Sequence, residues 1–101
     1  MPTTAKALFR GAASTTTTTT LYTVPSATTT VVTDIVVTNT AAASATFTMS
    51  LNGTRIAEGV TVAANDSTVI QIKQVLAATQ TITGGASATT VNFHISGVEI
   101  S

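Results

Sequence analysis

Ala45-Thr46-Phe47-Thr48-Met49-Ser50-Leu51-Asn52-Gly53 carries the clearest structural signal in this 101-residue chain. Apolar side chains at positions 45, 47, 49 and 51 alternate with hydroxyl side chains at positions 46, 48 and 50. This strict period of two predicts a strand with one buried and one solvated face. Asn-Gly is the strongest short-range signal for a type I′ turn, because both central positions of that turn need positive φ. We therefore expect an antiparallel hairpin whose second strand begins at Thr54-Arg55-Ile56.

Strand and turn signals recur along the rest of the chain at about ten residues, the spacing typical of a sandwich or barrel. No segment keeps the apolar i, i+3, i+4, i+7 spacing of a helix. We expect an all-β fold, a single antiparallel β-sandwich of about seven or eight strands, with the jelly roll as one candidate topology. The other expected strands are 21–24, 30–39, 60–62, 68–75, 79–83 and one that starts at Val91.

Side-chain alternation also predicts which residues share a face. Positions 31, 33, 35 and 37 are expected on one face of their strand, with Asp34 outward, and positions 68, 70 and 72 on one face of theirs. In the last strand the apolar positions move from Val91, Phe93 and Ile95 to Val98 and Ile100, which predicts a β-bulge or twist at Gly97. Gly84-Gly85 is expected to be a turn that closes the strand around Ile82.

Composition indicates a structural role rather than chemistry. Twenty-five residues are threonine, a β-branched residue that favours strands, whereas only 8% are charged and the net charge is zero. The four scattered cations make no basic stripe, so we expect no nucleic-acid partner. No apolar run has the length of a membrane span, and the amino terminus lacks the layout of a secretory signal. We expect one domain, no membrane association and synthesis in a cytoplasm.

His94 is the only general-base candidate with a pKa near neutrality, and Ser96 and Glu99 lie near it in sequence. In a strand His94 and Ser96 are ordinary outward residues, so we do not expect an enzyme. The four acidic residues fall on separate elements and cysteine is absent, so we expect no metal site and no cofactor.

Residues 1–14 differ from the rest and are expected to be either an amino-terminal arm or a first strand, with residues 15–101 forming the sandwich. An arm could carry Leu8 and Phe9 onto a neighbouring subunit. The run Thr15–Thr20 has no alternation to set a register, so it is expected to be an edge strand or a link. The candidate assembly contacts are Leu8, Phe9, Arg10, Thr15, Thr16, Thr17 and Tyr22.

Four segments together resemble the small all-β structural proteins of tailed bacteriophages, over roughly residues 21–99. They are Leu21-Tyr22-Thr23-Val24-Pro25, Ile35-Val36-Val37-Thr38-Asn39-Thr40, Asn52-Gly53 and Ser96-Gly97-Val98-Glu99. The chain departs from that pattern within residues 76–80, where an alanine replaces a glycine and Gln80 replaces an acid. This departure leaves the geometry of that loop open.

The resemblance implies a non-enzymatic virion protein, first of all a capsid decoration subunit that binds the outer shell. Its implied partners are the major capsid protein or other virion proteins and further copies of itself. Similar sandwiches also serve in tails, necks and baseplates, so those locations remain alternatives. A host-surface glycan-binding module is a further alternative, for which Tyr22 is the obvious aromatic platform.

Overall fold

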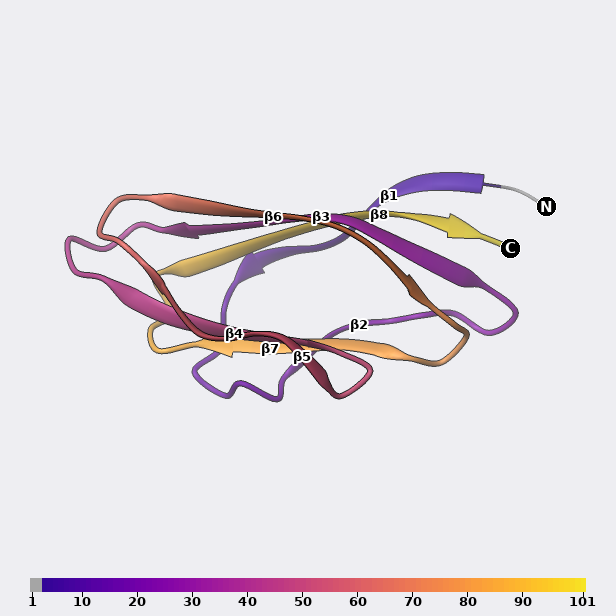
Figure 1. Ribbon diagram of the computed structural model, residues 1–101, viewed down its shortest axis with the longest axis horizontal. Helices are drawn as coiled ribbons and strands as arrows, with labels where there is room; N and C mark the ends of the chain where they lie inside the picture. Colours follow the sequence, from indigo (N-terminus) through magenta and orange to yellow (C-terminus); the bar gives the residue numbers. More distant parts are fainter. Residues whose placement is uncertain (1–2) are drawn as a thin grey trace.

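The computed structural model describes residues 3–101, which form eight strands in two facing four-stranded antiparallel sheets (Figure 1). Sheet A has the order β1-β8-β3-β6 and sheet B the order β2-β7-β4-β5. The all-β antiparallel sandwich is thereby confirmed. The strands are β1 (Thr3–Ala12), β2 (Thr20–Thr23), β3 (Thr29–Asn39), β4 (Ala45–Leu51), β5 (Thr54–Val62), β6 (Ser67–Leu76), β7 (Thr81–Ala86) and β8 (Val91–Ile100).

The topology is that of a jelly roll, a long hairpin folded over on itself. Its successive strand pairs are β4 with β5, β3 with β6, β2 with β7 and β1 with β8. The hairpin turns at Asn52 and Gly53, whose φ values of 49° and 80° are both positive, as its sequence predicts. At the open end Thr3 pairs with Ile100, so both ends of the described chain lie together.

The core lies between the sheets, where Phe47 of β4 meets Phe93 of β8 edge-on with ring centroids 6.1 Å apart. The apolar positions of β4 are buried as predicted. The expected solvated face of β4 is wrong in part, because Thr48 and Ser50 are buried too. The neighbouring strand β5 covers them: the Gly59 amide donates to Thr48 Oγ1, and Arg55 donates to Ser50 Oγ.

The predicted face of β3 is corrected by a bulge at Thr33. Val32 is buried before the bulge and Ile35 and Val37 after it, whereas Val31 and Thr33 are only half-buried. The register shifts between Val32 and Asp34 against both neighbouring strands. One inserted residue moves all earlier side chains to the other face, which an alternation count cannot foresee.

The bulge predicted at Gly97 is misplaced. Strand β8 keeps its alternation through Gly97, and the register shifts fall in its neighbours, at Thr33 of β3 and beside Leu8 of β1. Gly97 is required because a Cβ there would lie 2.5 Å from the Val31 carbonyl oxygen and 2.8 Å from Leu8 Cδ1. Continued alternation places Glu99 on the inner face.

Gly84-Gly85 is not a turn, contrary to expectation, but the buried second half of β7. A Cβ on Gly84 would lie 2.7 Å from the Thr48 carbonyl oxygen, and one on Gly85 would lie 2.7 Å from the Ser14 carbonyl oxygen. The two glycines therefore serve close backbone packing. The turn before β7 is closed by Gln80, whose Oε1 accepts a hydrogen bond from the Ala77 amide at 2.8 Å.

Residues 3–12 are the first strand of sheet A, paired with β8 along their length. The following threonine run forms an ordered loop and enters a strand only at Thr20. The Thr19 amide and hydroxyl both donate to the Thr16 carbonyl, and the Gly84 amide donates to the Thr19 carbonyl at 3.0 Å. The run is thus neither an edge strand nor a loose link.

Candidate interaction surfaces

A polar cluster ties the two sheets together at the end of the sandwich where the termini lie. The Tyr22 hydroxyl on β2 donates to the Glu99 carboxylate on β8 and accepts from the Thr30 hydroxyl on β3 at 2.9 Å. The Lys6 ammonium on β1 lies 3.4 Å from Glu99 Oε2. Glu99 therefore contacts side chains from β1 and β2 directly, and Tyr22 links it to Thr30 of β3.

The electrostatics of this cluster favour a stable structural contact between the two sheets. The hydrogen bond from Tyr22, together with the nearby Lys6, lowers the pKa of Glu99, while burial and the bond to Glu99 raise the pKa of Tyr22. A carboxylate with a lowered pKa is a weaker base, and a phenol with a raised pKa keeps its proton. The Tyr22 side chain is half-buried, and its hydroxyl is held by these hydrogen bonds.

The outer face of sheet A carries exposed apolar side chains. The register places Ala5, Val98, Val31 and Val75 in one cross-strand row, and Arg10, His94, Val36 and Val69 in another. Val69 and Val75 are 56% and 64% exposed, the most exposed large hydrophobic residues of the part described. Contiguous exposed apolar patches are common at interaction sites, which makes this face a candidate interaction surface. We call these two rows, with Ser96, Asp34 and Gln71 between them, the valine face.

His94 lies exposed on the valine face, with Arg10 and Val36 as its neighbours across the strands. Ser96 and Asp34 share that face, but Glu99 lies on the inner side. Within residues 3–101 no hydrogen bond or ion pair joins His94 to Ser96 or Asp34. The arrangement lacks the linked nucleophile, base and carboxylate that a triad needs.

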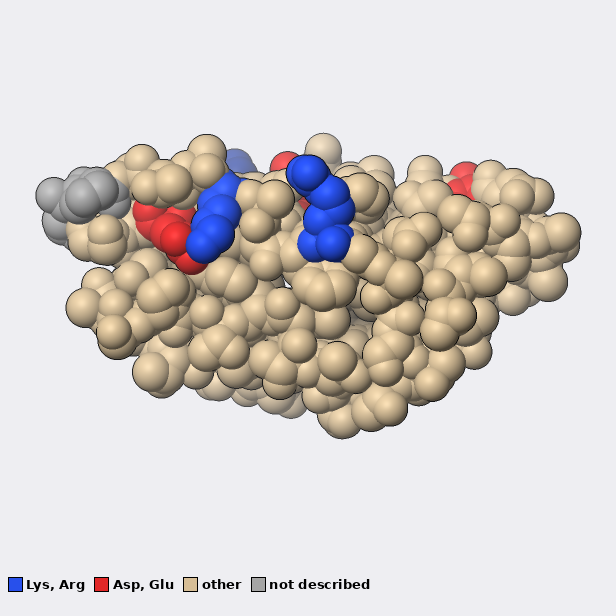
Figure 2. Space-filling model, turned by 180° about the vertical axis from the view of Figure 1, so that it is seen from behind, with Lys and Arg blue, Asp and Glu red and all other residues tan. Residues whose placement is uncertain are grey.

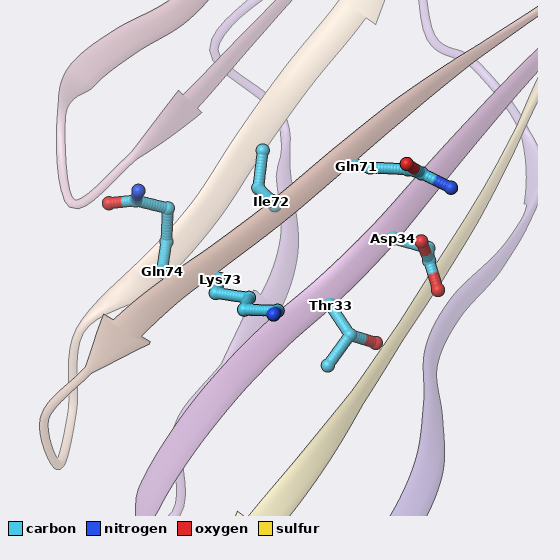
Figure 3. A pocket seen from close by; sticks show the side chains of 6 residues that line it. All are labelled: Thr33, Asp34, Gln71, Ile72, Lys73 and Gln74. Carbon is cyan, nitrogen blue, oxygen red and sulfur yellow. The ribbon is translucent and has the colours of Figure 1, made fainter.

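An open hollow of about 720 Å³ lies between β3 and β6, next to the valine face (Figure 3). The hollow lies where the register of the two strands shifts, because Ile72 and Lys73 of β6 are both opposite Thr33 of β3. Figure 3 shows the Asp34 and Gln71 side chains on one side of the strands and Lys73 running toward β3. The hollow is lined by Thr33, Asp34, Gln71, Ile72, Lys73 and Gln74.

The residues predicted as assembly contacts do not form one surface. Leu8 is 7% exposed and belongs to the core of its own domain, and its expected contact with a neighbouring subunit stays a prediction. Phe9 is half-buried over Gly11, and Arg10 projects from the valine face. Thr15, Thr16 and Thr17 lie in the loop against β7 of sheet B, and Tyr22 lies in the polar cluster.

The valine face was not predicted from the sequence. Four of its valines, at positions 31, 36, 69 and 75, are equally compatible with a buried position in the core. A partial signal existed: the pattern correctly placed Val69 opposite Ile70 and Ile72. Charged side chains also divide unevenly between the layers, and Figure 2 shows them along the layer of sheet A, whereas the layer of sheet B is uncharged on that side.

No protein-family model and no curated protein matches the chain. Residues 3–101 contain no group of three or more histidine, cysteine or acidic side chains that could hold a metal ion. They also contain no helix long and apolar enough to cross a membrane.

Proposed function

We propose that the protein is a non-enzymatic structural subunit of a tailed-bacteriophage virion, a decoration protein that binds the outer capsid shell through its valine face. The observation that carries the proposal is the pair of cross-strand rows with exposed valines, which run over all four strands of sheet A. The sequence resemblance over residues 21–99 supports the virion as the location.

The chemistry of the valine face suits attachment by burial. Apolar side chains fixed on a hydrogen-bonded sheet lose little conformational freedom when a partner covers them, so most of the burial free energy remains available for binding. Arg10 and His94 at one end of the face, and Asp34 within it, supply polar groups that orient a partner. The sandwich is 45 × 21 × 18 Å, so a large part of its surface can lie against a shell.

The test is binding of the purified protein to particles that lack it, with Val98→Lys as the variant and Thr61→Lys as the control. Val98 lies within the valine face, whereas Thr61 is exposed on β5 of sheet B. We expect saturable, stoichiometric attachment that Val98→Lys weakens at least ~10-fold and Thr61→Lys leaves unchanged, because an ammonium group in an apolar contact must be desolvated.

Cryo-electron microscopy of the saturated particle then locates the protein. Density on the shell, with sheet A facing it, is the expected result. Density on the tail, neck or baseplate would overturn the capsid location and keep the virion role. Equal loss of binding in Val98→Lys and Thr61→Lys would overturn the assignment of the valine face.

A further inference from the structure

We infer that the free edge of β6 pairs antiparallel with β6 of a second copy, centred on Ile72, so that two copies of sheet A join into one eight-stranded sheet. This inference deepens the proposed assembly role by naming the homotypic contact. It rests on the pairing capacity of β6, the placement of its exposed valines and the placement of charge around it.

The first observation is that β6 is the least protected edge strand of the four. Natural proteins guard such edges with charges, proline or short length. Strand β2 has four residues and precedes Pro25, β1 carries Lys6 and Arg10, and β5 carries Arg55 and Glu58. Strand β6 has ten residues and a single charge.

The free edge of β6 is also available for hydrogen bonding. Within residues 3–101, no residue of β6 makes a backbone–backbone hydrogen bond outside its ladder with β3, and only the Ser67 amide, at the start of the strand, donates to a side chain, that of Asp66. The register of β6 shifts against β3, but from Thr68 to Lys73 the strand itself keeps a regular alternation of half-buried and exposed residues. Gln74 and Val75 are both exposed, and Leu76 is buried. A second strand can therefore add to this edge.

The second observation is a symmetry in the sequence of β6. Val69 and Val75 lie three residues before and three residues after Ile72, and both project from the outer face. An antiparallel pair centred on Ile72 places Val69 directly opposite the partner's Val75, and the reverse. Each valine then packs against its counterpart across the new strand pair, which is the self-complementary contact that a two-fold interface requires.

The third observation is the placement of charge. In the same register Lys73 lies opposite the partner's Gln71, so the two ammonium groups do not face one another. Gln71 is in turn the cross-strand neighbour of Asp34, which places the partner's Lys73 in the row of an acidic side chain. Neither Lys73 nor Asp34 has an ion pair within residues 3–101.

Pairing of one strand with its copy buries a small area, in the class of transient interfaces. Light scattering of the isolated protein from ~10 µM to ~1 mM should therefore show the mass rising from 10.2 kDa toward twice that value. The double variant Val69→Lys/Val75→Lys should weaken the dimer at least ~10-fold, because it places like charges in opposition. Val98→Lys, which lies two strands away, is the matched control and should dimerise normally.

Cysteine cross-linking tests the register, since the natural chain has no cysteine. The double variant Val69→Cys/Val75→Cys should form a covalent dimer under mild oxidation, because directly opposed residues have the short Cα separation that a disulfide needs. Each single variant should remain uncross-linked, because its two copies lie about 20 Å apart along the strands.

A mass that stays at the monomer value up to ~1 mM would overturn the inference. Equal cross-linking of the single and double variants would overturn the register. Because both tests use the isolated protein, a dimer without particle binding counts against the capsid role alone. Particle binding without a dimer counts against the strand pairing alone.

Discussion

Some single residues that hold the two sheets together have no distinctive signal in the sequence. Asn39 ends a predicted strand and looks like a turn residue, yet it is fully buried. Its amide donates to the Ala43 and Val62 carbonyls, and its Oδ1 accepts from the Ala41 amide at 3.1 Å. Ala41 and Ala43 lie in the loop that follows Asn39, whereas Val62 is the last residue of β5 in the other sheet, so only the completed fold brings Val62 to this amide.

Tyr22 and Glu99 are the residue pair whose role is most directly measurable. Replacing Tyr22 with phenylalanine removes a charge-assisted hydrogen bond and keeps the ring, so we expect a loss of about 1 to 2 kcal/mol in the free energy of unfolding near neutral pH. Urea denaturation monitored by circular dichroism measures this loss. Thr23→Val, exposed on the same strand, is the control and should cost little.

The pH dependence of stability provides an independent signature of the pair. The folded pKa of Glu99 is lowered from 4.5, so its contribution is present above pH 4.5 and is lost as pH falls through the folded pKa. The folded pKa of Tyr22 is raised from 10.0, so its contribution is present below pH 10.0 and is lost as pH rises through the folded pKa. Tyr22→Phe should therefore make the free energy of unfolding less dependent on pH on both the acid and the alkaline side. An unchanged dependence on the acid side would contradict the hydrogen bond between Tyr22 and Glu99.

At the scale of elements, alternation predicted the strands well and their irregularities poorly. The hairpin at Asn52-Gly53 and the faces of β6 follow from residues close in sequence, and both are confirmed. The bulge at Thr33 and the burial of Gly84-Gly85 depend on what neighbouring strands do. The valine face was missed for the same reason, because valine favours a strand whichever face it occupies.

Strand β1 contributes Leu8 to the core. Leu8→Ala should lower the free energy of unfolding of the isolated protein by about 2 to 3 kcal/mol, because it empties a buried site above Gly97. The neighbouring change Ala7→Ser, at an exposed position, is the control and should cost little. Urea denaturation measures both. Normal stability together with weakened particle attachment would instead indicate an arm that acts on other subunits.

For the whole molecule, the jelly roll determines which contacts can form early. Strands β4 and β5 meet across a two-residue turn, whereas β1 and β8 join opposite ends of the chain. Loop closure costs more entropy as the loop lengthens, so pairing should proceed outward from Asn52-Gly53. The seam between β1 and β8 should close last, which makes the strand that bears Leu8 the final part of the core to be completed.

Folding kinetics can test this order. Gly53→Ala is strained at a φ of 80° and should slow folding roughly threefold to fivefold with little effect on unfolding, because the turn already exists in the transition state. Leu8→Ala should mainly accelerate unfolding. Stopped-flow circular dichroism in urea measures both rates, and relaxation in milliseconds to seconds is expected for a fold dominated by distant pairings. If Leu8→Ala slows folding while Gly53→Ala accelerates unfolding, the terminal strands nucleate this jelly roll and the central hairpin forms later.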